Sequence, residues 1–141
     1  MPIVNNPKQT KDLGKEIAKK ALKSKKAFVI GLQGELGAGK TTFTQGFAKA
    51  LGIKDKILSP TFVIFKKFKL KNKYLYHIDC YRIRNSKELI DLGFKEIINN
   101  PLNIVVIEWA DKINRIMPKN ALWIKFEFID ELKRKIDLKG D

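Results

Sequence analysis

The stretch GELGAGKTTF, residues 34–43, decides the fold that this sequence predicts. It follows the apolar run from Ala27 to Leu32, which is typical of a buried strand, and it precedes a helical pattern from Thr42 to Leu51. Glycines in such a loop let the backbone turn until successive N–H groups point at one phosphate. The spacing matches the P-loop pattern G-x-x-x-x-G-K-S/T, so the loop is predicted to bind a nucleotide polyphosphate.

Two side chains give this loop its chemistry. Lys40 would reach the β- and γ-phosphates as a mobile positive charge, and Thr41 would place its hydroxyl on Mg²⁺. The helix that begins near Lys40 directs the positive end of its dipole at the same anion. The alternative is a flexible turn with an incidental lysine, but a tight loop alone needs only about one or two glycines and no lysine.

Two acidic residues are candidates for the rest of the site. Phosphoryl transfer needs a carboxylate that holds metal and a group that orients the attacking oxygen. Glu108 ends the apolar stretch IVVIE, and Asp79 ends YLYHID. Ligands of open α/β sheets bind beyond the carboxyl ends of the strands, so both acids are expected to converge on the loop. The alternative for each is a solvated carboxylate at a strand end.

Three other residues near these segments have roles that are not catalytic or that have an alternative. Thr61, in SPTF, fits a switch-loop hydroxyl that senses the γ-phosphate, and an ordinary loop residue equally well. His77 alternates with its neighbours in a strand pattern, so it is predicted to be half-buried rather than catalytic. Trp109 is expected to pack or to face the nucleotide, without a chemical role.

The remaining chain predicts further helices and strands. Thr10 is expected to cap a helix that runs to about Ser24. Residues 62–70 and 74–83 flank KNK and predict a β-hairpin. Further expected elements are a mostly helical segment at 86–98 that is capped by Ser86 and broken at Gly93, a buried strand at 103–110 and a second hairpin at 121–141. Together they predict an α/β protein, a P-loop NTPase-like mixed β-sheet flanked by helices, with residues 1–141 forming a single P-loop ATPase domain.

Composition bears on partners and compartment. The formal net charge of +14 at pH 7 invites a nucleic-acid surface, but lysines are scattered through every segment, and compositional drift would give the same excess. Cys80 is the only cysteine, which excludes an internal disulfide and a cysteine-built zinc site. The start MPIVNNPKQTKD lacks the apolar core of a signal peptide, and the apolar runs are only strand-length. These features predict a cytoplasmic protein without a membrane partner.

Four segments together resemble the TsaE (YjeE) family: LQGELGAGKTTFTQGFAKALG, SPTFVI, YLYHIDCYRI and VVIEWADKI. The resemblance covers nearly the whole chain, and its most specific part is H-x-D-x-Y-R after S-P-T-F with I-E-W downstream. It implies a bacterial P-loop ATPase that is required for N6-threonylcarbamoyladenosine at position 37 of tRNA. The family works with the TsaB–TsaD pair, and ATP binding and hydrolysis would act as a switch that resets that complex.

The resemblance also implies roles for individual residues. Thr41 and Glu108 would hold Mg²⁺, while Asp79 would lie near the attacking water or the metal shell. Thr61 would be the switch residue, so the catalytic set would be Asp79, Lys40 and Thr61. Thr10 and Trp109 would adjoin the nucleotide, Thr10 on its adenine side. The phosphate-binding residues would be Gly34, Glu35, Leu36, Gly37, Ala38, Gly39, Lys40, Thr41 and Thr42.

Three positions depart from the family pattern. Glu35 stands where the family usually has Asp, Cys80 where an apolar residue is common, and Ala110 where Pro often follows the tryptophan.

Two other functions compete with the ATPase switch. The main rival is a small-molecule P-loop kinase, but the chain has only four arginines and no lid-sized insertion. The second rival is a nucleotide-gated nucleic-acid-binding module, which the positive charge motivates. Direct contact with tRNA stays open.

Overall fold

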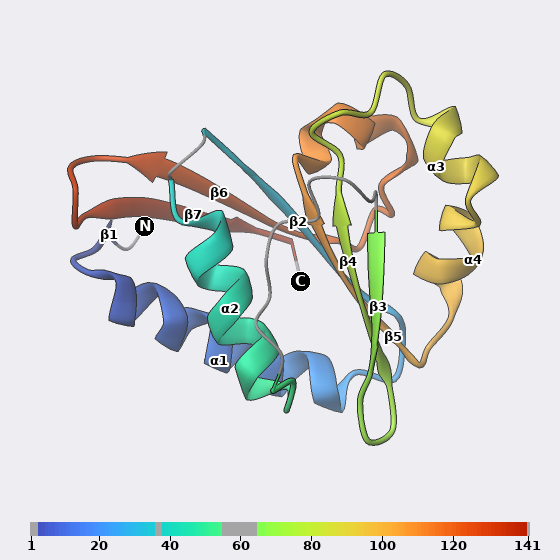
Figure 1. Cartoon of the computed structure of the whole chain (residues 1–141), viewed down its shortest axis with the longest axis horizontal. Helices are drawn as coiled ribbons and strands as arrows, with labels where there is room; N and C mark the ends of the chain where they lie inside the picture. Colours follow the sequence, from blue (N-terminus) through green and yellow to red (C-terminus); the bar gives the residue numbers. More distant parts are fainter. Residues whose placement is uncertain (1–2, 36–37, 55–64, 141) are drawn as a thin grey trace.

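The computed structural model describes residues 3–35, 38–54 and 65–140, which form a mixed seven-stranded sheet with helices on both faces (Figure 1). The strand order is β1-β7-β6-β2-β5-β4-β3. The strands are β1 (Ile3–Val4), β2 (Phe28–Gly34), β3 (Phe65–Lys69), β4 (Tyr74–Asp79), β5 (Asn103–Glu108), β6 (Leu122–Phe128) and β7 (Arg134–Lys139). The helices are α1 (Pro7–Lys23), α2 (Lys40–Ala50), α3 (Lys87–Asp91), α4 (Phe94–Asn99) and the 3₁₀ helix η1 (Ala110–Ile116).

Parallel strands form the centre of the sheet, and antiparallel hairpins form its edges. β2 pairs in parallel with β5 on one side and β6 on the other, and β4 pairs in parallel with β5. The β3–β4 and β6–β7 pairs are antiparallel. β5 is buried along its whole length, as expected for a central strand that is covered on both faces. This position explains why the four residues between Asn103 and Glu108 are all apolar.

Each face of the sheet has its own apolar core. On one face α1 and α2 cover Ile30, Leu32 and the other side chains of the first cluster (Figure 1). On the other face, α3, α4 and η1 cover a second cluster that includes Val105 and Ile107. α1 and α2 approach closely at their glycines: a Cβ atom on Gly46 would lie 2.7 Å from the Cα atom of Lys11. The close approach holds α2 directly against α1.

The structure confirms the α/β class and most predicted elements but corrects the first helix. Asn6 is the N-cap: its side chain accepts a hydrogen bond of 3.0 Å from the backbone N–H of Gln9. Pro7 follows as the first helical residue, the position that proline favours. The predicted cap at Thr10 is therefore wrong, and Thr10 lies inside α1 with an exposed fraction of 2%.

Other boundaries shift by a few residues. The strand predicted from Ala27 to Leu32 starts one residue later and continues to Gly34. The helix predicted from Thr42 begins at Lys40, because the chain turns into the helix at Gly39. Both hairpins and the break at Gly93 are confirmed; Gly93 has a φ of 91° between α3 and α4. None of the helices in the described ranges has the length and apolar character needed to cross a membrane.

Candidate functional site

The glycine loop connects the carboxyl end of β2 to the first turn of α2. Gly34 and Gly39 have φ values of 143° and 109°, which L side chains rarely adopt. A Cβ atom on Gly34 would also lie 2.5 Å from the carbonyl oxygen of Phe126 on β6. The predicted phosphate-binding residues Leu36 and Gly37 lie outside the described residues. The described part has the strand–loop–helix geometry that a P-loop requires.

Lys40, the first residue of α2, lies against this loop. Its exposed fraction is 5%, and its Nζ donates a hydrogen bond of 2.6 Å to the carbonyl oxygen of Gly34. The same atom lies 3.5 Å from the ring centroid of Trp109, in a cation–π contact. Burial lowers the pKa of Lys40, and the negative charges of Glu108, Asp111 and Asp79 partly oppose that shift. Because Lys40 is the first residue of α2, its ammonium and the positive end of the α2 dipole lie at the same end of the helix.

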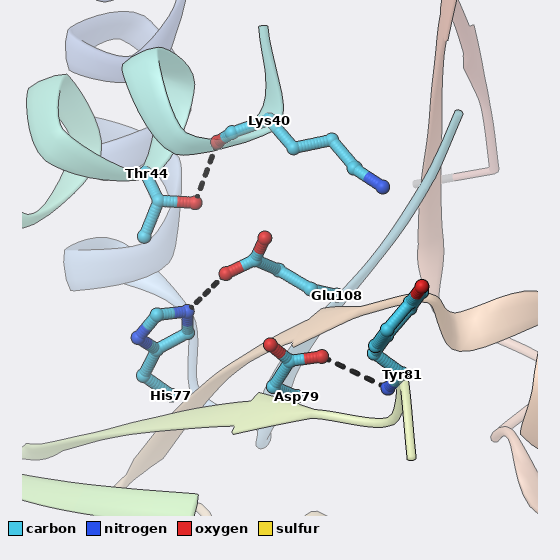
Figure 2. Close-up of polar contacts among 6 residues, drawn as sticks. All are labelled: Lys40, Thr44, His77, Asp79, Tyr81 and Glu108. Atoms are coloured by element: carbon cyan, nitrogen blue, oxygen red, sulfur yellow. Dashed lines mark hydrogen bonds and ion pairs between the residues drawn. The ribbon is translucent and has the colours of Figure 1, made fainter. Parts of the chain in front are cut away.

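Thr41 and Thr42 follow in the first turn of α2. Thr41 is exposed and Thr42 is half-buried. One turn further, the hydroxyl of Thr44 donates a hydrogen bond of 2.9 Å to the carbonyl oxygen of Lys40 (Figure 2). Ala38 is buried, whereas Glu35 is exposed at the start of the loop. Thr41 is therefore not enclosed by the fold, and its role as a metal-binding residue stays a prediction.

The two predicted acids lie side by side at the ends of neighbouring parallel strands. Asp79 on β4 is directly opposite Glu108 on β5. Glu108 has an exposed fraction of only 4%, and one of its oxygens lies 2.6 Å from Nε2 of His77. Asp79 accepts a hydrogen bond of 2.9 Å from the backbone N–H of Tyr81. Figure 2 shows Glu108 between Lys40 on one side and His77 with Asp79 on the other. Residues from α2, β4 and β5 therefore meet at one place.

Trp109 follows Glu108 in an unusual backbone conformation. Its φ and ψ are 58° and 39°, in the left-handed region where a bulky residue is an outlier. Its ring packs against Tyr81, with 5.1 Å between the ring centroids, and against the ammonium of Lys40. Strained backbone of this kind tends to occur at functional sites, because the surrounding contacts must hold it in place. The structure thus places Trp109 beside the loop.

Three sequence predictions have other outcomes. Thr61 lies outside the described residues, so its switch role stays a prediction. Thr10 is buried in α1, and its approach to an adenine stays a prediction too. His77 was expected to be half-buried, but its exposed fraction is 1% and it contacts Glu108. Its two-residue spacing from Asp79, which puts both side chains on one face of β4, was the available signal.

Comparison with known proteins adds to this geometry. The sequence model of the family described as "Threonylcarbamoyl adenosine biosynthesis protein TsaE" matches residues 4–136. The chain belongs to the TsaE family. Membership of TsaE connects the chain with the biosynthesis of threonylcarbamoyladenosine in tRNA.

Individual TsaE proteins match over most of their length. The chain is 40% identical over 131 residues to the tRNA threonylcarbamoyladenosine biosynthesis protein TsaE of Bacillus subtilis, covering 93% of this chain and 79% of that protein. It is 36% identical over 135 residues to the TsaE protein of Rickettsia felis, covering 95% and 76%. The crystal structure of Bacillus subtilis YdiB superposes with a TM-score of 0.76 at 35% identity, covering 96% of this chain and 80% of that chain.

Proposed function

We propose that this chain binds ATP with Mg²⁺ and hydrolyses it, as a nucleotide switch on the TsaB–TsaD complex during formation of N6-threonylcarbamoyladenosine at position 37 of tRNA. Membership of the TsaE family supports the pathway. The observation that carries the ATPase part is the convergence of Lys40, Asp79 and Glu108 beside the N-terminus of α2. Residues 1–141 would act as one ATPase unit.

The proposed site divides the work between the backbone and a few side chains. N–H groups between Gly34 and Thr42 hold the phosphates, and Lys40 exchanges its hydrogen bond to Gly34 for oxygens of the β- and γ-phosphates. Asp79 orients the attacking water and accepts its proton while the bond from the water oxygen to the γ-phosphorus forms and the bond from the γ-phosphorus to the β–γ bridging oxygen breaks, so that ADP leaves. Thr61 responds to the γ-phosphate, while Thr10 and Trp109 adjoin the nucleotide.

The residues at the loop fit a magnesium ion. Mg²⁺ in nucleotide sites takes one or two carboxylates or hydroxyls from the protein, together with phosphate oxygens and water. Thr41 is an exposed residue that carries a hydroxyl, and Glu108 supplies a carboxylate at the end of the strand next to β2. When bound, the ion would neutralise charge on the phosphates.

A partner is expected to complete the site. Strong hydrolysis by P-loop proteins usually needs a positive group on the γ-phosphate, and an arginine finger accelerates it by roughly 10³–10⁵. Arg82, three residues beyond the end of β4, is exposed and therefore free to face a partner rather than the loop. The isolated protein should hydrolyse ATP slowly, and addition of TsaB–TsaD should raise the rate.

The rate of phosphate release shows directly whether TsaB–TsaD stimulates ATP hydrolysis. The purified chain is assayed alone, then with TsaB–TsaD titrated in, and both measurements are repeated with Thr61→Ala and in the presence of tRNA. The proposal predicts stimulation by the pair and less stimulation of Thr61→Ala, because the switch hydroxyl is gone. A fast isolated enzyme that ignores TsaB–TsaD would refute the switch and favour a small-molecule kinase. Stimulation by tRNA alone would point to direct contact with RNA.

A further inference from the structure

His77 is a buried polar residue that the proposed chemistry does not use. It is the only histidine of the chain, and its exposed fraction is 1%. A polar side chain is costly to bury unless it is hydrogen-bonded, and here the Nε2 atom lies 2.6 Å from Oε2 of Glu108, itself 4% exposed. So short a contact between two buried groups holds both side chains in one orientation.

The strand register brings the two residues together. β4 and β5 are parallel, and His77 is opposite Val106 while Asp79 is opposite Glu108. Side chains two residues apart on a strand share a face, so His77, Asp79 and Glu108 all lie on the face covered by α2. His77 is therefore one diagonal step from Glu108, toward the amino end of β4. From there its ring reaches the carboxylate from the side opposite to Lys40 (Figure 2).

The two oxygens of Glu108 consequently have different surroundings. Oε2 points to His77, while the other carboxylate oxygen points away from the imidazole, toward the side of Lys40 and Thr44 (Figure 2). An ionised carboxylate can only accept hydrogen bonds, so the bond requires a proton on Nε2 of His77. With Oε2 occupied in this way, the second oxygen is the one available to a ligand at the loop.

We propose that His77 is a positioning residue for Glu108: its Nε2–H fixes Oε2 and so directs the second oxygen toward the Mg²⁺ that accompanies the nucleotide. This inference rests on the proposed function. Hydrogen bonds that orient a ligand of a metal ion change metal affinity by roughly 10–100-fold. The same contact in a purely structural role would leave metal affinity unaffected.

Two nearly isosteric substitutions distinguish these roles. His77→Gln retains an N–H donor at about the place of Nε2, whereas His77→Met has similar length and no donor. Both lose the ring, so damage to packing is common to the pair. A non-hydrolysable ATP analogue is titrated into each full-length protein by calorimetry, with and without Mg²⁺. The measured quantity is the factor by which Mg²⁺ tightens binding of the analogue.

The positioning role predicts that His77→Met lowers this factor by about tenfold or more while Mg²⁺-free binding is unchanged, and that His77→Gln restores most of it. Equal factors in His77→Met and the parent would overturn the positioning role and leave the proposed function intact. Equal losses in both variants would also overturn it, because the ring and not the donor would then matter. A parent protein that binds the analogue without any effect of Mg²⁺ would overturn the proposed function as well.

A second measurement needs no variant and no nucleotide. Because the chain has one histidine, a two-bond ¹H–¹⁵N NMR spectrum of the ¹⁵N-labelled protein, purified without a histidine tag, shows a single imidazole. The proposal requires that Nε2 carries the proton and that this proton exchanges slowly with water, since the pair is buried. An imidazole that is protonated only on Nδ1 would refute it, even if His77→Met failed to fold.

Discussion

Replacing Lys40 by methionine should leave the fold stable while it weakens nucleotide binding. A hydrogen bond from a charged donor contributes about 1.5–3 kcal/mol, and a cation–π contact about 0.5–2 kcal/mol. Lys40 makes one of each, to Gly34 and Trp109. Burial opposes both, because it disfavours the ammonium and lowers its pKa. Methionine has similar length and no charge to desolvate, so the free energy of unfolding should change by no more than about 1 kcal/mol.

Nucleotide affinity should respond differently. Loss of a single charged hydrogen bond to the phosphates, at about 1.5–3 kcal/mol, weakens binding of a non-hydrolysable ATP analogue by roughly 10–150-fold. Turnover should fall further, because charge on the transferred group is stabilised most strongly in the transition state. Urea unfolding followed by circular dichroism gives stability, calorimetry gives affinity, and phosphate release gives turnover.

Lys49→Met is the matched control for this experiment. Lys49 lies in the last turn of the same helix and is exposed, so its substitution removes one charge without touching the loop. Nucleotide binding by Lys49→Met should equal that of the parent. If Lys40→Met bound the analogue as tightly as Lys49→Met, the phosphate-binding role of Lys40 would be refuted. If Lys40→Met lost more than about 3 kcal/mol of stability, the cost of burying the ammonium would not offset its hydrogen bond and its cation–π contact, and the stability prediction would be wrong.

Three further measurements examine the rest of the site. Glu108→Ala should weaken Mg²⁺-dependent binding of the ATP analogue as well as hydrolysis, whereas Asp79→Ala should keep binding and lose turnover; calorimetry showing the reverse pattern would exchange the two roles. Since the folded-state pKa of Lys40 is below its ordinary 10.5, the unfolded chain binds more protons in the alkaline range between these two values. The free energy of unfolding of the parent should therefore rise with pH there relative to Lys40→Met, and urea titrations that show a fall would contradict this. Burial raises the pKa of Cys80 to about 12, and its side chain is 0% exposed, so a disulfide reagent at about pH 8 should label it roughly 10³-fold more slowly in the native state than in urea.

The sequence predicted the parts of the structure that depend on local patterns. The β2–loop–α2 unit follows from an apolar run, correctly spaced glycines and one lysine, all within about twenty-five residues. The error at the first helix was also local, because Asn6 and Pro7 form a stronger start signal than Thr10. The strand before the loop extends to Gly34 and the helix after it begins at Lys40, because residues that were assigned to the loop adopt extended or helical geometry.

Contacts between distant segments could not be predicted in the same way. Both acids were expected at strand ends, but the register that sets Asp79 opposite Glu108 depends on how β4 and β5 pair. A shift of one residue would send these side chains to opposite faces. The burial of His77 follows from the same pairing and from the position of α2 above it. The sequence pattern of each strand contains no information about its partner.

The position of β2 in the sheet has a consequence for synthesis of the protein. Its two neighbours, β5 and β6, are both translated after it, and Gly34 at its end pairs with Phe126 of β6. While the chain emerges from the ribosome, the strand that precedes the glycine loop therefore does not have both of its lateral partners until more than ninety further residues, through the end of β6 at Phe128, have been added. A ribosome-bound fragment that already contains the whole loop would still lack β6, whose residue Phe126 packs against Gly34. The proposed nucleotide site would thus be completed late in translation, although its loop is made early.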